Sequence, residues 1–364
     1  MSYYESIKSA VLVSIFYSAV YFVASFIAFY SLLKIAYVWV RSSAKSWTRY
    51  KRRELPPECL NDPVYGEHGY IQIKNIKLHY VQNGDKTKPL MLFLHGFPDF
   101  WYSWRYQMKH FSKHYWVVAV DLRGYGDSEK PVNVYEYKIK YLVSDVKNLI
   151  TALGREKCIL VSHDWGALIG YYFLFKYPEM VEKYVIINMY PVFATSFKWT
   201  QLIKSWYMFL FQLPYFPELL LEFKDLEIFD KVFKGFSHDD IEAYKFTFGK
   251  SGGFTHGINY YRANFLKIFL SYKKKPESVT FPKGLLIYTD NDRYIHISNL
   301  LETKDKIENL QLSFIKSGSH FLHQRKHEDT NKIMSKFLGL ENYDDPGEGK
   351  SLQCDDNSPQ KASS

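Results

Sequence analysis

Apolar residues along the chain follow two alternating patterns. Short, near-continuous apolar runs are typical of strands buried on both faces, and the longer stretches between them have the three-to-four-residue apolar spacing of helices. The runs that we interpret as strands are Ile71–Ile73, Ile76–Val81, Leu90–Leu94, Trp116–Val120, Cys158–Val161, Tyr184–Ile187, Leu285–Tyr288 and Leu310–Phe314. The first two predict a hairpin, and Ile139–Leu153 and Ala167–Phe175 have helical spacing. The alternation predicts an α/β fold with a mostly parallel, doubly wound sheet.

This alternation stops between about residues 191 and 280, where the chain is rich in aromatic residues and has helix-like spacing. We interpret this stretch as a helical lid inserted into one α/β domain that covers residues 63–342. Residues 343–364 are acidic, poor in apolar residues and contain Ser, Pro and Gly, which predicts a disordered tail.

The run Ala10–Leu33 contains no charge, Gly or Pro, and it is long enough to span a bilayer as a helix. A buried core helix is one alternative, and a secretory signal peptide is another. A signal peptide has a shorter apolar region followed by a cleavage site with small residues. Because basic and aromatic residues follow this longer run, we predict a retained single-pass transmembrane anchor at residues 10–33.

Positive charge is concentrated just after this anchor, in the juxtamembrane segment and linker of residues 34–62. The cations are Lys34, Arg41, Lys45, Arg49, Lys51, Arg52 and Arg53. The positive-inside rule places this side, and the folded domain with it, in the cytosol; the endoplasmic reticulum is the expected membrane. These charges account for most of the formal net charge of +9. We therefore interpret them as a membrane signal and expect no nucleic-acid partner.

The sequence predicts neither a metal site nor a disulfide framework, because its three cysteines are widely spaced. The chemistry that we infer below requires no metal and no organic cofactor. The oligomeric state is left open.

The segment Leu160–Ala167 carries the clearest chemical signal, because an apolar strand runs directly into a helical pattern there. Small residues, Ser162 and Gly166, flank Asp164 at the position that a nucleophilic serine occupies in a strand-turn-helix elbow. An aspartate at this position can attack an electrophilic sp³ carbon and form an ester. The alternative is that Asp164 only caps the helix.

Two further segments supply partners for such a nucleophile. His95-Gly96-Phe97-Pro98 follows a predicted strand, so the backbone N–H groups of Phe97 and Trp165 are candidates for an oxyanion hole. Farther along, Asp290 and Asp292 follow one strand and His320 follows the next. The chain order nucleophile, acid and histidine is that of the α/β hydrolases.

These segments, together with Trp101–Gln107 and Asp121–Ser128, resemble those of α/β-hydrolase-fold epoxide hydrolases, especially the animal soluble and membrane-anchored members. The resemblance extends from about Pro63 to Leu340. It implies an α/β-hydrolase fold, with Asp164 as nucleophile and His320 as base. Asp292 is implied as the acid that orients His320, with Asp290 as the competing choice.

The resemblance also implies two lid tyrosines that hold the epoxide oxygen. Tyr207 precedes the element Phe211–Pro214, and Tyr261 lies in the element Asn259–Arg262. Because the chain contains 31 tyrosines, the local patterns carry this assignment rather than the residue type.

The expected function is hydrolysis of hydrophobic epoxides, such as epoxy fatty acids, to diols. A haloalkane or haloacetate dehalogenase shares the fold and the aspartate but has to stabilise a halide, which the paired tyrosines do not favour. A serine esterase is disfavoured because no serine occupies the elbow. A third alternative is a catalytically inactive protein that binds lipid at the membrane.

Overall fold

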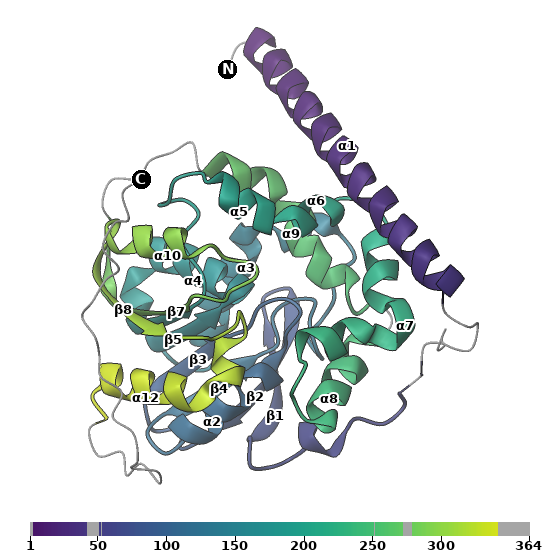
Figure 1. The fold of residues 1–364 in the computed structure, drawn as a ribbon. Coiled ribbons are helices and arrows are strands. Elements are labelled where there is room, and N and C mark those ends of the chain that lie inside the picture. Colours follow the sequence, from purple (N-terminus) through teal and green to yellow (C-terminus); the bar gives the residue numbers. More distant parts are fainter. Residues whose placement is uncertain (1–2, 42–50, 52, 251, 272–278, 341–364) are drawn as a thin grey trace.

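The computed structural model describes residues 3–41, 51, 53–250, 252–271 and 279–340. The predicted tail at residues 343–364 lies outside the described residues, as does part of the basic segment. The described chain begins with one long helix and continues into a sheet that is covered by helices (Figure 1).

Eight strands of the described chain form one sheet in the order β1-β2-β4-β3-β5-β6-β7-β8. The strands are β1 (Glu67–Ile73), β2 (Ile76–Asn83), β3 (Leu90–Leu94), β4 (Trp116–Val120), β5 (Cys158–His163), β6 (Val181–Ile187), β7 (Val279–Thr289) and β8 (Ile307–Ile315). Strands β1 and β2 form the antiparallel hairpin, β2 is antiparallel to β4, and the remaining pairs are parallel. This topology confirms the predicted mostly parallel sheet.

Helices lie on both faces of this sheet, which is why its central strands are apolar throughout (Figure 1). Helix α2 packs against α12 on one face, and α3 packs against α4 on the other. The helices of the α/β domain outside the lid are α2 (Arg105–Phe111), α3 (Ile139–Ala152), α4 (Asp164–Lys176), α10 (Ile297–Lys304), α11 (Leu322–Arg325) and α12 (His327–Leu338). Because Leu94 of β3 pairs with Ser162 of β5, the loops after these two strands emerge side by side.

Among the residues that the structure describes between β6 and β7, five helices are present, and we call them the lid helices. They are α5 (Trp199–Lys204), α6 (Trp206–Leu210), α7 (Phe216–Val232), α8 (His238–Phe248) and α9 (Thr255–Ser271). The bounds predicted for the lid, about residues 191–280, stay a prediction. Helix α7 is interrupted at residues 223–226, where Lys224, Asp225 and Leu226 adopt positive φ angles.

Helix α1 (Tyr3–Arg41) contains a stretch, Ala10–Tyr37, that is long and apolar enough to cross a membrane, with a mean hydropathy of 2.1. It lies along the lid helices and contacts α6 (Figure 1). Val20, Ala24 and Ala28 are buried in this contact. Two of these residues are alanines, and small side chains let helix backbones approach closely.

Arg53 connects the segment after α1 to the lid. Its guanidinium donates to both carboxylate oxygens of Asp225 at 2.9 Å and to Glu242 at 2.8 Å. Asp225 also accepts a hydrogen bond from the backbone N–H of Lys51. Left-handed backbone costs a non-glycine residue about 1–2 kcal/mol, and these contacts hold Asp225 in the interrupted part of α7.

We expect Arg53→Ala to loosen α7 locally, because it removes the cation that faces two partly buried carboxylates. Charge-assisted hydrogen bonds of this kind contribute about 2–3 kcal/mol. Hydrogen exchange should show faster opening of residues 220–232, while the strands β3 and β5 keep their protection. Lys250→Ala, which breaks an exposed pair with Asp127, is the matched control and should change exchange little. Unchanged protection of α7 in Arg53→Ala would contradict the anchoring role.

Candidate active site

Asp164 lies at a sharp turn between β5 and α4, and it has a φ of +50°. Two glycines make this turn possible. A Cβ on Gly166 would lie 2.2 Å from the carbonyl oxygen of Leu94, and a Cβ on Gly96 would lie 2.3 Å from the Cβ of Asp164. Both separations are below any normal contact, so the close approach of the β3 loop to the elbow requires glycine at both positions.

The residues expected in the oxyanion hole lie beside this carboxylate. The N–H of Phe97 donates to Oδ1 of Asp164 at 2.8 Å. Trp165 is in the first turn of α4, where backbone N–H groups have no partner inside the helix. The strand register that brings the two loops together therefore positions one donor on Asp164 and a second next to it.

The loops after β7 and β8 bring His320 to Asp164. His320 Nε2 lies 3.5 Å from Asp164 Oδ2, and His320 Nδ1 lies 2.7 Å from Asp292 Oδ2. The other oxygen of Asp292 accepts from the N–H groups of Tyr294 and Ile295. Asp290 instead accepts from Thr289 and from the N–H of Ser317. The structure thus places Asp292, and not Asp290, against His320.

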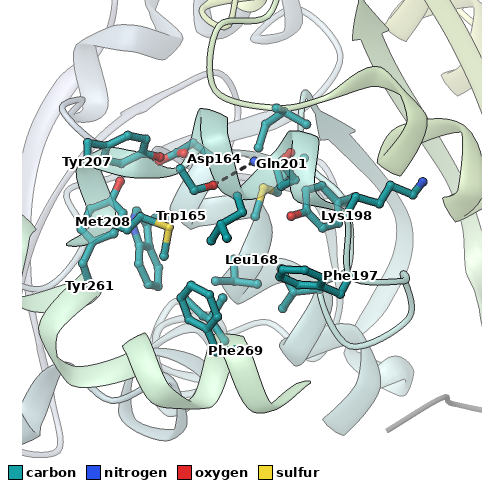
Figure 2. A pocket seen from close by; sticks show the side chains of 17 residues that line it. Asp164, Trp165, Leu168, Phe197, Lys198, Gln201, Tyr207, Met208, Tyr261 and Phe269 are labelled. Atoms are coloured by element: carbon teal, nitrogen blue, oxygen red, sulfur yellow. Dashed lines mark hydrogen bonds between the residues drawn. The ribbon is translucent and has the colours of Figure 1, made fainter. Parts of the chain in front are cut away.

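Tyr207 of α6 and Tyr261 of α9 lie near each other, beside Asp164 and Trp165 of the elbow (Figure 2). Their ring centroids are 5.8 Å apart, and the ring of Tyr261 packs edge-on against Trp165. The neighbouring Tyr260 points elsewhere, because its hydroxyl donates to the carbonyl of Arg123. The structure therefore brings together all seven residues that the sequence nominated.

Burial and charge set the protonation of these groups. Burial raises the pKa of Asp164, but the hydrogen bond and charge of His320 outweigh it, so the pKa lies below its ordinary value. Burial lowers the pKa of His320, but Asp292 and Asp164 together raise it to about 10. Burial, followed by the charge of Asp164, raises the pKa of Tyr207 well above 10. Burial likewise raises the pKa of Tyr261. Both tyrosines therefore keep their protons at neutral pH.

Two apolar chambers meet at Asp164, Tyr207 and Tyr261. The smaller, of about 70 Å³, extends between Leu168, Phe269 and the segment that contains Phe197 (Figure 2). The larger, of about 580 Å³, extends between α6 and α7 as far as Lys34 and Ile35 of α1. A molecule that reaches Asp164 is thus surrounded mainly by hydrocarbon and aromatic rings.

Sequence reasoning did not identify three residues that shape the site. The ring of Tyr294 packs against His320 at 4.9 Å and against Tyr207 at 5.7 Å. Gln201 and Lys204 of α5 donate to backbone carbonyls of the loop that carries Asp292. No motif distinguishes these residues in the sequence. Their only signals are closeness to Asp292 for Tyr294 and membership of the lid for the other two.

A cluster of buried polar groups lies behind His320. Oδ2 of Asp99 lies 3.9 Å from Nδ1 of His163 and 4.0 Å from Nε2 of His323, and none of the three atoms has a hydrogen-bond partner within the described chain. These residue types can ligate a metal. Tetrahedral zinc with bonds of about 2.0–2.1 Å needs ligand atoms about 3.4 Å apart. The cluster is wider than that, and we assign it no metal.

Comparison with known proteins agrees with this geometry. The family described as the alpha/beta hydrolase fold matches residues 89–325, and the chain belongs to it. The chain is 37% identical to human epoxide hydrolase 4, over 89% of this chain and 93% of that protein. It is 34% identical to epoxide hydrolase 3 of Xenopus tropicalis, over 89% and 92% of the two chains. An epoxide hydrolase from Bacillus megaterium, solved with a naphthyloxy-propanediol product, superposes with a TM-score of 0.68 and 33% identity, over 74% of this chain and 100% of that one. Within the α/β hydrolases, the chain is an epoxide hydrolase.

The polar cluster generates a prediction about pH. Burial raises the pKa of Asp99 to about 7, whereas an unfolded aspartate has a pKa of about 3.9. The folded protein therefore keeps a proton that the unfolded chain loses, and its stability falls as pH rises from about 4 to 7. Asp99→Asn should remove this dependence, because its amide imitates the protonated acid facing Nδ1 of His163.

Urea unfolding at pH 5 and pH 7 measures the difference. The parent should lose on the order of 2–3 kcal/mol more than Asp99→Asn between these two pH values. The control Asp239→Asn, whose side chain is 81% exposed, should retain the parent's dependence. Parallel pH profiles of the parent and Asp99→Asn would exclude a raised pKa at Asp99.

Proposed function

We propose that the protein converts hydrophobic epoxides, in particular lipid epoxides, to vicinal diols through an ester on Asp164. The observation that carries this proposal is the position of Asp164 at the elbow, opposite two protonated tyrosines in an apolar cavity. Epoxide opening requires both a carbon nucleophile and a donor to the departing ring oxygen, and these residues provide them.

In the first step, Asp164 Oδ2 attacks an epoxide carbon. The N–H of Phe97 holds Oδ1, which becomes the carbonyl oxygen of the ester. A new carbon–oxygen bond forms as the ring carbon–oxygen bond breaks. Tyr207 and Tyr261 donate to the ring oxygen, and one of the two transfers its proton to that oxygen as negative charge develops on it, which leaves a tyrosinate. Hydroxyl donors match an alkoxide, and this favours an epoxide over the haloalkane of a dehalogenase.

In the second step, water hydrolyses the ester. Conversion of Asp164 to an ester removes one of the two carboxylate charges that raise the pKa of His320. The pKa of His320 then falls, so its imidazolium gives up a proton, and this proton restores the tyrosine that was deprotonated in the first step. The neutral imidazole, oriented by Asp292, takes a proton from water. The resulting hydroxide attacks the ester carbonyl, and the N–H groups of Phe97 and Trp165 stabilise the oxyanion. The Cγ–Oδ2 bond of the ester then breaks, and the new carboxylic acid of Asp164 gives its proton to the departing oxygen. The diol leaves with Asp164 again a carboxylate and His320 again protonated.

The apolar chambers support a lipid epoxide as substrate. The apolar stretch of α1 and the basic residues after it support anchoring in a membrane, with the catalytic domain on the cytosolic side. The endoplasmic reticulum fits this arrangement. The domain bounds that we propose are 10–33 for the anchor, 34–62 for the juxtamembrane linker and 63–342 for the hydrolase domain.

Diol formation from an epoxy fatty acid by the purified full-length protein tests the reaction. We expect the parent to produce diol and Asp164→Ala to produce none above the uncatalysed rate, because no nucleophile remains. Mass spectrometry of the products measures both. Halide release from haloalkanes without any diol would favour a dehalogenase, and lipid binding without turnover would favour an inactive lipid-binding protein.

Replacement of the base should separate the two steps. In His320→Gln the first step remains possible, but water is no longer activated, so the ester should accumulate. Intact-protein mass spectrometry should show an increase equal to the mass of one epoxide, located by peptide mapping at Asp164. The double variant Asp164→Ala/His320→Gln is the control. A folded His320→Gln protein that gains no mass after substrate treatment would contradict the covalent scheme.

A further inference from the structure

Exposed apolar side chains are concentrated in one segment of the lid. Outside α1, six of the fifteen exposed large hydrophobic residues in the described chain fall within residues 197–219, which include α5, α6 and the start of α7. We call these six residues the lid face; they are Phe197, Trp199, Ile203, Trp206, Tyr215 and Leu219. Trp199 and Ile203 are each 72% exposed. Clusters of exposed aromatic and aliphatic groups of this kind mark a surface that is covered in the native setting.

Helix α1 lies next to part of this face, as Figure 1 shows for α6 and α7. Its contacts with the rest of the protein extend from Phe16, which packs on Phe265 and Phe269, to Ile35 in the larger chamber. At 1.5 Å per helical residue, this distance is about 28 Å, so the contact with the lid follows most of the apolar stretch of α1. If α1 lies in a membrane, the part of the lid that packs on α1 is therefore not surrounded by water alone.

The larger chamber ends beside α1. Lys34 and Ile35 of α1 form part of its lining opposite Leu220 and Lys224 of α7, and Trp206 belongs both to the chamber and to the lid face. The ammonium groups of Lys34 and Lys224 suit the phosphate region of a membrane, while the leucine and phenylalanine lining between them and Asp164 suits an acyl chain.

We propose that α1 and the lid face form one lipid-contacting surface, and that the larger chamber opens within it, so that the epoxide enters from the lipid and not from water. The occupant of the lid face is therefore the bilayer itself. The source of the substrate rests on the proposed function, whereas contact with lipid does not, and the two can be tested separately.

Tryptophan quenching in vesicles tests the contact. Full-length protein is reconstituted in phosphatidylcholine vesicles whose acyl chains carry bromine, which quenches tryptophan on contact. Trp199→Phe and Trp206→Phe should each remove fluorescence that brominated lipid quenches, while Trp116→Phe, which replaces a buried tryptophan of β4, should remove fluorescence that it does not quench. Quenching of Trp199 and Trp206 by aqueous iodide and not by brominated lipid would overturn the proposal.

Substitutions at the chamber mouth test the entry route. Ile35→Trp narrows the mouth, whereas Leu33→Trp adds the same bulk at a position on α1 that is 52% exposed and does not line the chamber. We expect Ile35→Trp to lower kcat/KM at least fivefold for a long-chain epoxide dissolved in vesicles, through KM, and to lower kcat/KM for water-soluble styrene oxide less than twofold. Leu33→Trp should match the parent with both substrates.

The outcomes separate the two proposals. Equal losses for both substrates, or no loss for either, would overturn entry from lipid. Absence of turnover by the parent with both epoxides would instead contradict the proposed function, and the quenching result would still decide whether the lid face contacts lipid. Styrene oxide turnover also shows that each variant is folded.

Discussion

The negative charge buried at Asp164 is the constraint on which the rest of the site depends. Removing a carboxylate from water is costly unless donors and positive charge replace the water. The N–H of Phe97 and the imidazole of His320 provide that replacement, and they hold the pKa of Asp164 below its ordinary value. To reach them, Asp164 adopts a strained backbone conformation, and Gly96 and Gly166 are needed so that the adjacent loop can approach. The register of the sheet and the residues of the turn are therefore both needed to hold the one carboxylate of Asp164 in place.

The lid does more than cover Asp164 and His320, because hydrogen bonds connect it to the loop that carries Asp292. Lys204 and Gln201 of α5 bind carbonyl oxygens in the loop that presents Asp292, and Asp292 in turn binds His320. A displacement of α5 would thus be transmitted to His320 through two successive hydrogen bonds, first to the loop and then from Asp292. The aromatic ring of Tyr294 fills the space between His320 and Tyr207. His320, Tyr294 and Tyr207 therefore pack together with the lid, so the position of the lid and the orientation of His320 are linked.

The sequence predicted those parts of the fold in which local pattern and environment agree. Strands β3, β4 and β5 are buried on both faces, so their apolar runs define them almost to the residue. Strand β1 begins at Glu67, four residues before the predicted start, because its first residues are exposed and polar and give no apolar signal. Asp164 and His320 were predictable from chain order and turn chemistry. Tyr294 was not, because one tyrosine among many is recognised only by what it contacts.

The many aromatic residues of the lid account for both the interior and the exterior of the lid. Inside, aromatic residues exclude water from Tyr207 and Tyr261, and this exclusion is the largest cause of their raised pKa values. Helices α5 and α6 are only six and five residues long, and they do not bury all of their aromatic residues. Trp199 and Trp206 consequently face outward. In water this exposure would favour aggregation, whereas beside an apolar helix such as α1 it extends an existing apolar surface. A dry catalytic cavity under the lid is therefore physically consistent with a location beside a membrane.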